Sequence, residues 1–151
     1  MTRIPRAIVE AMVAHAREGL PNEVCGMVHA AEGMPIEAYP VTNTAASPYR
    51  YEMHPLQMLR LENRRDETGE TLFAIYHSHV ASEARPSPTD VRNAFFPPGE
   101  VQQPPMFPGT YYVLVSLAHD PPHVRAWRIH SAPTVDDAIA AMQEEPIEVV
   151  G

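Results

Sequence analysis

An apolar run that ends in two histidines is the feature that most constrains the fold of this chain. Residues 72–75 read LFAI and lead directly into YHSH at residues 76–79. A short apolar run bounded by polar turn residues predicts a buried β-strand, which we expect over residues 71–79. Successive side chains of a strand point to opposite faces, so His77 and His79 share one face. Their Cα atoms would lie about 6.5 Å apart, which lets both imidazoles reach one metal ion.

A helix start follows this strand. In the sequence Ser87-Pro88-Thr89-Asp90, Ser stands at the N-cap, Pro at the first helical position and an acid three residues after the cap. The intervening peptide can loop back and bring Asp90 to the two imidazoles. Two nitrogens and one carboxylate oxygen suit zinc, and three protein ligands leave a fourth position open, as in catalytic zinc sites. In the alternative interpretation, Asp90 only caps the helix.

The size and charge of the chain exclude several classes of protein. Its 151 residues predict one domain over residues 1–151, long enough to bury a core. The net charge of −8 argues against nucleic acid and anionic membranes as partners. The single cysteine excludes an internal disulfide and favours a reducing compartment. With no apolar run of membrane-spanning length and no signal peptide, we expect a cytoplasmic protein.

The rest of the chain predicts short elements separated by many of its 17 prolines. In the helix at residues 55–65, we expect Leu56, Met58 and Leu59 to face inward and Arg65 to face solvent. The Pro-rich segment 96–109 excludes a regular helix or central strand, so we expect a long, poorly ordered loop that shapes the substrate channel. The other expected elements are a helix at 5–18, a hairpin of strands at 24–30 and 36–42, strands at 49–53, 111–117, 124–130 and 147–150, and a short helix at 135–142.

Several further side chains have two interpretations. Glu23, at a helix-to-strand junction, is either a solvated loop carboxylate or a functional acid. Cys25 is either a nucleophile or, as its apolar strand favours, a core residue. Gly26 indicates a close backbone approach. His119 and His123 flank a turn and could bind metal, although exposed turn residues are the favoured interpretation.

Taken together, these residues resemble the JAMM (MPN-plus) zinc metalloprotease family. The family pattern is a Glu ahead of Cys-Gly, then His-[Ser/Thr]-His, a spacer, and Ser-x-x-Asp. It is matched here by Glu23 before Cys25-Gly26, by His77-Ser78-His79, and by Ser87 with Asp90. One departure is Val80, where many members have Pro. The resemblance covers nearly the whole chain and is strongest to short bacterial members that process sulfur carriers.

The resemblance implies a fold and a set of roles. The fold would be α/β (α+β), with a cytidine-deaminase-like central mixed β-sheet flanked by helices. One Zn²⁺ per chain would be held by His77, His79 and Asp90. Glu23 would act as general base, and Ser87 would help zinc to stabilise the charge that develops on the carbonyl oxygen. Ser87 fits a purely capping role as well. Ser78 points to the opposite strand face, so we expect it to be structural.

The resemblance also implies a substrate. The expected partner is a ubiquitin-like sulfur-carrier protein, cleaved after its C-terminal Gly-Gly to release cysteine or another C-terminal residue. One alternative is a broader protease for ubiquitin-like tails. A second is a non-catalytic MPN scaffold, which the intact ligand set argues against. A third is a hydrolase that uses Cys25 and a histidine.

Overall fold

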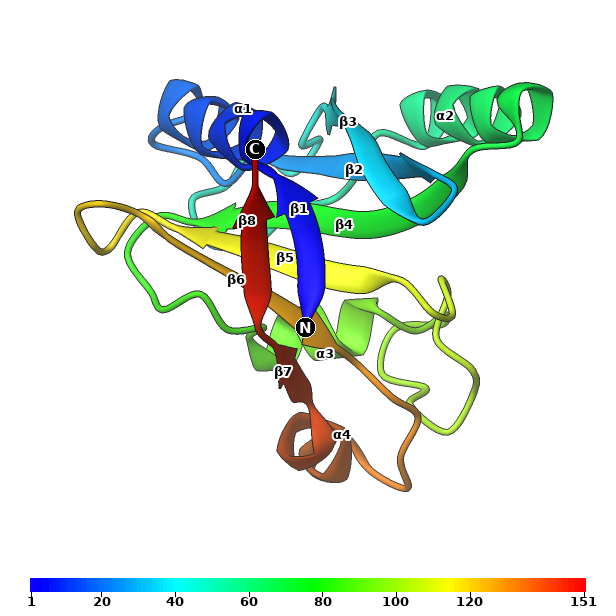
Figure 1. The fold of residues 1–151 in the computed structure, drawn as a ribbon. Coiled ribbons are helices and arrows are strands. Elements are labelled where there is room, and N and C mark those ends of the chain that lie inside the picture. Colours follow the sequence, from blue (N-terminus) through cyan, green and yellow to red (C-terminus); the bar gives the residue numbers. More distant parts are fainter.

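A six-stranded sheet with the order β3-β2-β4-β5-β6-β7 runs through the computed structural model, which describes residues 1–151 (Figure 1). Strands β4 and β5 are parallel, and every other neighbouring pair is antiparallel. The predicted class, a mixed sheet flanked by helices, is therefore confirmed. The strands are β2 (Cys25–Ala31), β3 (Met34–Val41), β4 (Thr71–His79), β5 (Tyr111–Ser116), β6 (His123–Arg128) and β7 (Gln143–Glu145).

A second, two-stranded sheet joins the ends of the chain. It pairs β1 (Thr2–Pro5) with β8 (Ile147–Val150) in parallel. The sequence predicted β8 but not β1, because Pro5 was assigned to the first turn of the helix. Pro5 instead ends the strand and serves as N-cap of α1 (Arg6–Glu18). The other helices are α2 (Pro55–Thr68), α3 (Pro88–Asn93) and α4 (Val135–Ala141).

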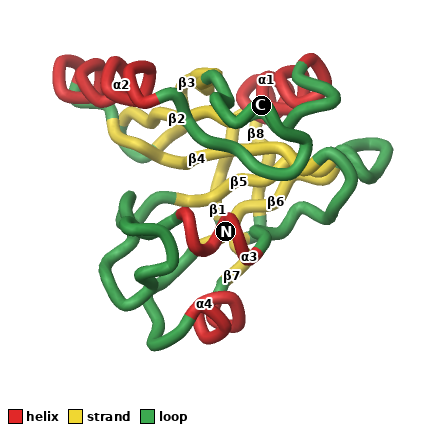
Figure 2. The backbone as a smooth tube through the Cα atoms, turned by 180° about the vertical axis from the view of Figure 1, so that it is seen from behind, coloured by secondary structure: helices red, strands yellow, loops and turns green.

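The six-stranded sheet separates two hydrophobic cores. One core packs α1 against one face, and the other packs α3 and α4 against the opposite face, as the views from both sides show (Figures 1 and 2). Within β4, Ala74 and Tyr76 belong to the α1 core, whereas Ile75 belongs to the α3 core. Because strand side chains alternate, His77 and His79 continue the face of Ile75. Both histidines therefore point toward the side of the sheet that carries α3.

Helix α2 shows a different inward face from the one expected. Leu56 and Leu59 are each 49% exposed, and no residue of the helix is buried. The half-buried Met58 and Arg65 are seven residues apart, which places them on one side of a helix two turns apart. The Arg65 guanidinium lies 3.0 Å from Nε2 of the buried His29. The predicted orientation was right for Met58 and wrong for Leu56, Leu59 and Arg65, because the buried His29 offers the arginine a polar partner on the sheet.

Two loops also differ from expectation. The segment 49–53 is not a strand and makes only one isolated bridge, between Asn43 and Met53. The segment 96–109 lacks a helix or strand, as predicted, but its middle is anchored. Val101 is buried and its carbonyl accepts a hydrogen bond from the Ala132 N–H at 2.9 Å. This hydrogen bond connects the middle of the loop to the segment that precedes α4. No helix has the length and apolar character needed to cross a membrane.

Gly26 is required where β2 passes Tyr76. A Cβ atom at this position would overlap both the Tyr76 ring and the backbone carbonyl oxygen of Tyr39, which confirms the predicted close approach. The Tyr76 ring cannot swing away freely, because its hydroxyl is 2.7 Å from Nδ1 of His15.

We predict that Gly26→Ala destabilises the fold by about 1–3 kcal/mol, the usual range for overpacking a filled core. Urea unfolding followed by circular dichroism measures this change as a lower midpoint at an unchanged slope. An unchanged midpoint would mean that β2 can shift away from Tyr76 without cost.

Candidate active site

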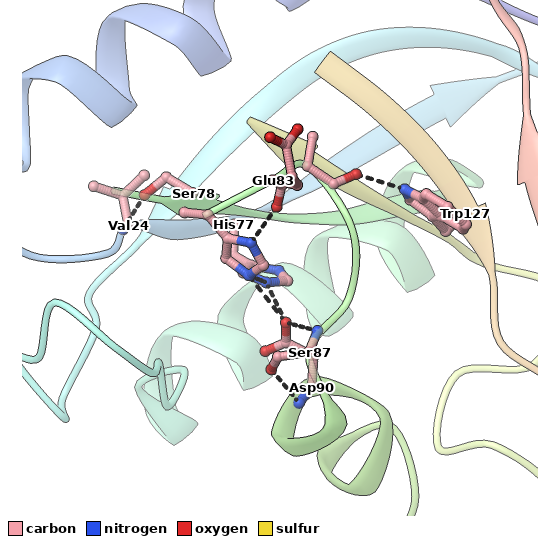
Figure 3. Close-up of polar contacts among 9 residues, drawn as sticks. Val24, His77, Ser78, Glu83, Ser87, Asp90 and Trp127 are labelled. Atoms are coloured by element: carbon pink, nitrogen blue, oxygen red, sulfur yellow. Dashed lines mark hydrogen bonds and ion pairs between the residues drawn. The ribbon is translucent and has the colours of Figure 1, made fainter. Parts of the chain in front are cut away.

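Three side chains that the sequence singled out converge at the end of β4. Nε2 of His77 lies 3.3 Å from Nε2 of His79, and each nitrogen lies 3.1 Å from Oδ2 of Asp90 (Figure 3). All three residues are buried. The strand supplies both histidines on one face, and the start of α3 supplies the carboxylate. The structure thus brings together the three residues expected to bind metal.

This triangle fits a tetrahedral zinc ion. Zinc binds nitrogen and carboxylate oxygen at about 2.0–2.2 Å, so two ligand atoms of a tetrahedral site are roughly 3.3 Å apart. The three observed separations, 3.1, 3.1 and 3.3 Å, are close to this value. The donor set of two imidazoles and one carboxylate is also one that zinc favours.

Asp90 is held by the cap of α3. The Ser87 N–H donates to Oδ2 of Asp90 at 2.8 Å, and the Asp90 N–H donates to the Ser87 hydroxyl oxygen at 3.1 Å, which completes a capping box (Figure 3). Burial opposes ionisation of Asp90, but the adjacent imidazoles of His77 and His79 and the hydrogen bond from the Ser87 N–H outweigh it, so the pKa of the carboxyl is lowered. Asp90 therefore caps the helix and remains charged toward the histidines.

His79 is oriented by the loop that follows β4. Its Nδ1 lies 2.7 Å from the backbone carbonyl of Glu83, which accepts the ring hydrogen and leaves Nε2 free on the side of Asp90 (Figure 3). The neighbouring carbonyl of Ala84 accepts a hydrogen bond from the Trp127 indole at 2.8 Å. The loop is thereby anchored at the residue that follows the carbonyl orienting the imidazole.

His77 is oriented by an aromatic ring instead. Its Nδ1 is buried and has no hydrogen-bond partner. The Tyr51 ring stacks on the imidazole, with centroids 4.5 Å apart and planes 29° apart. Tyr51 therefore restricts the ring plane of His77, in place of the hydrogen bond that usually orients a metal-binding histidine. The sequence gave no signal for this contact, because Tyr51 comes from an irregular segment far from His77 in the chain.

Glu23 lies beside these residues in a desolvated position. Its side chain is 5% exposed, and Oε1 has no hydrogen-bond partner. Burial raises the pKa of Glu23 to about 7, with a smaller opposing effect from His79. Ser78, on the opposite face of β4, helps to hold this segment: its hydroxyl accepts from the Val24 N–H at 2.8 Å (Figure 3). Ser78 thus holds the backbone next to Glu23 against β4, although its own side chain points to the face opposite His77 and His79. This is the structural role that we expected for Ser78.

Cys25 is poorly suited to act as a nucleophile. It is completely buried, and its thiol lies 3.4 Å from the Val41 carbonyl oxygen. Burial, with a further contribution from Glu23, raises the pKa of the thiol to about 12. The reactive form of cysteine is the thiolate, which is almost absent at neutral pH with such a pKa. The structure therefore favours the core interpretation of Cys25.

Comparison with known proteins identifies relatives over most of the chain. The family model of prokaryotic homologs of the JAB domain matches residues 5–130. The CysO-cysteine peptidase of Mycobacterium tuberculosis (strain ATCC 25618 / H37Rv) is 38% identical over 146 residues, which cover 95% of this chain and 87% of that protein. The desampylase of Haloferax volcanii is 34% identical over 95 residues, covering 58% of this chain and 68% of that protein.

A solved structure has a similar fold. The solution structure of protein DSY2949 from Desulfitobacterium hafniense superposes with a TM-score of 0.77 at 29% identity. The match covers 99% of this chain and 93% of the other. The likeness therefore includes the N-terminal and C-terminal elements as well as the six-stranded sheet.

We predict that Tyr51 controls how tightly the chain binds zinc. Tyr51→Ala removes the ring that stacks on His77 and should weaken zinc binding by about tenfold or more, the range found for residues that orient metal ligands. Tyr51→Phe keeps the ring and should bind zinc like the wild type. Competition with a chromophoric chelator measures both affinities.

Two histidine variants serve as controls for this zinc-binding measurement. His77→Ala removes an expected ligand and should lose most of the tightly bound zinc, whereas His130→Ala changes an exposed histidine outside the site and should lose none. Equal zinc affinities for Tyr51→Ala and Tyr51→Phe would contradict the orienting role of the ring.

Proposed function

The chain belongs to the prokaryotic JAB family of JAMM-type peptidases, and on that premise we propose that it is a zinc-dependent enzyme that cleaves after the C-terminal Gly-Gly of a ubiquitin-like sulfur-carrier protein. The observation that carries this proposal is the buried triangle of His77, His79 and Asp90 with Glu23 at its side. The products would be the mature carrier and the released residue, for which we favour cysteine.

In the proposed reaction, the zinc ion and the side chains have different roles. Zinc, when bound by His77, His79 and Asp90, supplies a Lewis acid that acidifies water and polarises a carbonyl oxygen. The protein must then hold the ligands, accept a proton from water and return it to the leaving amine. It must also stabilise the negative charge that develops on the carbonyl oxygen during attack.

Glu23 is suited to move that proton. A general base works best when its pKa lies near the operating pH, and the pKa of Glu23 is raised to about 7 by burial. Its backbone is fixed from two directions: the Glu23 N–H donates to the Ser47 carbonyl at 2.9 Å, and the Asn43 amide donates to the Glu23 carbonyl at 2.9 Å. The carboxylate can therefore take a proton and give it up without a change in the backbone.

Ser87 is suited to stabilise the developing charge. Its hydroxyl oxygen already accepts a hydrogen bond from the Asp90 N–H, which leaves the hydroxyl hydrogen free to donate. Because Ser87 is half-buried at the start of α3, that hydrogen can reach a carbonyl group brought close to Asp90. Capping and charge stabilisation thus use different parts of one hydroxyl group.

An apolar cleft next to the site supports an extended peptide as the substrate. The cleft has a volume of about 280 Å³ and begins at Tyr51, the residue that stacks on His77. The Pro-rich loop 96–109 contributes part of its lining. Most of its lining is apolar or aromatic, including Met58, Phe95, Phe96, Met106, Phe107 and Tyr112. Such a cleft can hold the extended chain that precedes a Gly-Gly end, with the two glycines beyond Tyr51 on the side of His77.

The relatives support a carrier tail as the substrate class. One is named a CysO-cysteine peptidase and another a desampylase. We therefore propose to incubate the zinc-loaded protein with a CysO-type carrier that ends in Gly-Gly-Cys and to follow the carrier by intact mass. The expected result is the loss of one cysteine residue, which a chelator abolishes and added zinc restores.

The same assay separates the alternatives. Equal cleavage of unrelated ubiquitin-like fusions after Gly-Gly would favour the broader tail-processing protease. No cleavage of any Gly-Gly substrate by protein that carries zinc would overturn the proposal and favour a scaffold.

We predict that Glu23→Gln keeps the fold and the zinc but loses activity. Glutamine is nearly the same size but cannot accept a proton at neutral pH, and general base catalysis is typically worth about 10²–10⁴-fold. The value of kcat/KM for carrier cleavage should fall by that factor, with metal content and carrier binding unchanged. In the wild type, kcat/KM should decrease as the pH falls below the pKa of Glu23, because the protonated carboxyl cannot act as a base. A Glu23→Gln protein with full activity would require another base.

We predict that Cys25→Ala keeps both zinc and substantial turnover. The thiol is buried with a raised pKa, so its removal leaves a small core cavity and no chemical defect. The melting temperature should fall, whereas kcat at a temperature where the variant is folded should stay within a few-fold of the wild type. Loss of turnover in a folded, zinc-loaded variant would favour the thiol mechanism.

A further inference from the structure

A second cluster of metal-binding side chains lies near the end of β4. Glu83, His119 and His123 each place one ligand atom within 4.8 Å of the other two. Glu83 belongs to the loop that follows β4. His119 lies in the turn that joins β5 to β6, and His123 is the first residue of β6. None of these side chains takes part in the proposed hydrolysis, so the cluster requires a separate explanation.

Strand pairing explains why this cluster forms next to His79. His79 of β4 lies opposite Ser116 of β5, and Ser116 lies opposite His123 of β6. Paired residues on neighbouring strands share a face, so the three side chains form a row across the sheet. The loop after β4 lies over this row, because the Ser116 hydroxyl donates to the Ser82 carbonyl at 2.6 Å. Glu83 therefore reaches the β5–β6 turn.

The two imidazoles have nitrogen atoms available for an ion. Nε2 of His119 lies 3.0 Å from both carboxylate oxygens of Glu83. The rings of His119 and His123 are stacked, with centroids 3.8 Å apart and planes 9° apart. A neutral imidazole keeps a lone pair on one ring nitrogen, and that lone pair can bind an ion. In addition, Nδ1 of His123 is buried and has no hydrogen-bond partner.

We propose that Glu83, His119 and His123 bind a second divalent transition-metal ion, with zinc as the expected species. Two imidazole nitrogens and one carboxylate oxygen form a donor set that zinc favours. The Glu83 and His119 side chains are 63% and 35% exposed, so an ion can enter from solvent and water can complete its coordination. Since the two rings are parallel, one ring turns about its Cβ–Cγ bond so that both lone pairs meet at the ion.

Glu83 connects this second site to the first. Its carboxylate belongs to the new cluster, whereas its backbone carbonyl accepts the Nδ1 hydrogen of His79 at 2.7 Å. An ion bound by the Glu83 side chain ties the loop to the β5–β6 turn and so fixes the carbonyl that orients His79. The second ion is therefore structural, and it sits on the far side of His79 from Asp90.

The test is a zinc titration of the full-length chain, stripped of metal with a chelator and followed by calorimetry. The wild type should bind two equivalents, the second more weakly. Glu83→Gln keeps the backbone carbonyl and removes only the charged ligand, and His119→Ala removes an accessible imidazole. Each variant should bind the first equivalent and weaken the second by at least about tenfold. Asp120→Asn, which removes one negative charge from the same turn outside the cluster, should bind two equivalents like the wild type.

Two outcomes would overturn the proposal. Binding of one equivalent only by the wild type would mean that Glu83 and His119 form a simple ion pair. Two unchanged equivalents in both Glu83→Gln and His119→Ala would place the second ion elsewhere. Histidine ring signals in NMR spectra provide an independent readout, because those of His119 and His123 should shift only as the second equivalent is added. These measurements do not involve peptide cleavage, so their result does not depend on the proposed function.

Discussion

The burial of two imidazoles and a carboxylate in one place is the constraint on which the rest of this structure depends. Buried polar groups without partners cost about 1–3 kcal/mol each, so neighbouring segments must supply hydrogen bonds. Ser87 supplies one to Asp90 and the Glu83 carbonyl accepts one from His79, whereas His77 has only the Tyr51 ring. The remaining atoms, Nε2 of each histidine and Oδ2 of Asp90, face one another. Their lone pairs can stay this close only if shared protons or a cation lie between them, which makes the site a natural place for an ion.

The precision of this site derives from an irregular loop held by three strands. The consecutive carbonyls of residues 82–84 accept hydrogen bonds from the side chains of Ser116 on β5, His79 on β4 and Trp127 on β6. Each of these carbonyls is anchored from a different strand of the same sheet. The loop therefore has no regular structure, yet its position is set by the pairing of β4, β5 and β6. Core packing and the orientation of the His79 imidazole are in this way parts of one arrangement.

Much of the fold could be predicted from the sequence because its signals are local. The apolar run at residues 72–75, the hairpin expected at 24–30 and 36–42 and the helix start at Ser87 are each encoded by neighbouring residues, and all were predicted within a few residues. The errors share a different cause. β1 forms only because β8 lies beside it, and α2 turns Arg65 rather than its leucines toward the sheet because the buried His29 is there. Tyr51 was missed for the same reason, since its contact with His77 exists only after the chain has folded.

The two carboxyl groups of the site show how one environment can support two different roles. Asp90 accepts a hydrogen bond from the Ser87 N–H and lies against two imidazoles, so its pKa is lowered despite burial and it stays ionised. Glu23 is buried with one oxygen unpaired, so its pKa rises to about 7. Pairs of acids whose pKa values are driven apart are typical of sites that need one permanent charge and one exchangeable proton. This difference supports the proposed roles of the two acids, ligand binding for Asp90 and proton transfer for Glu23.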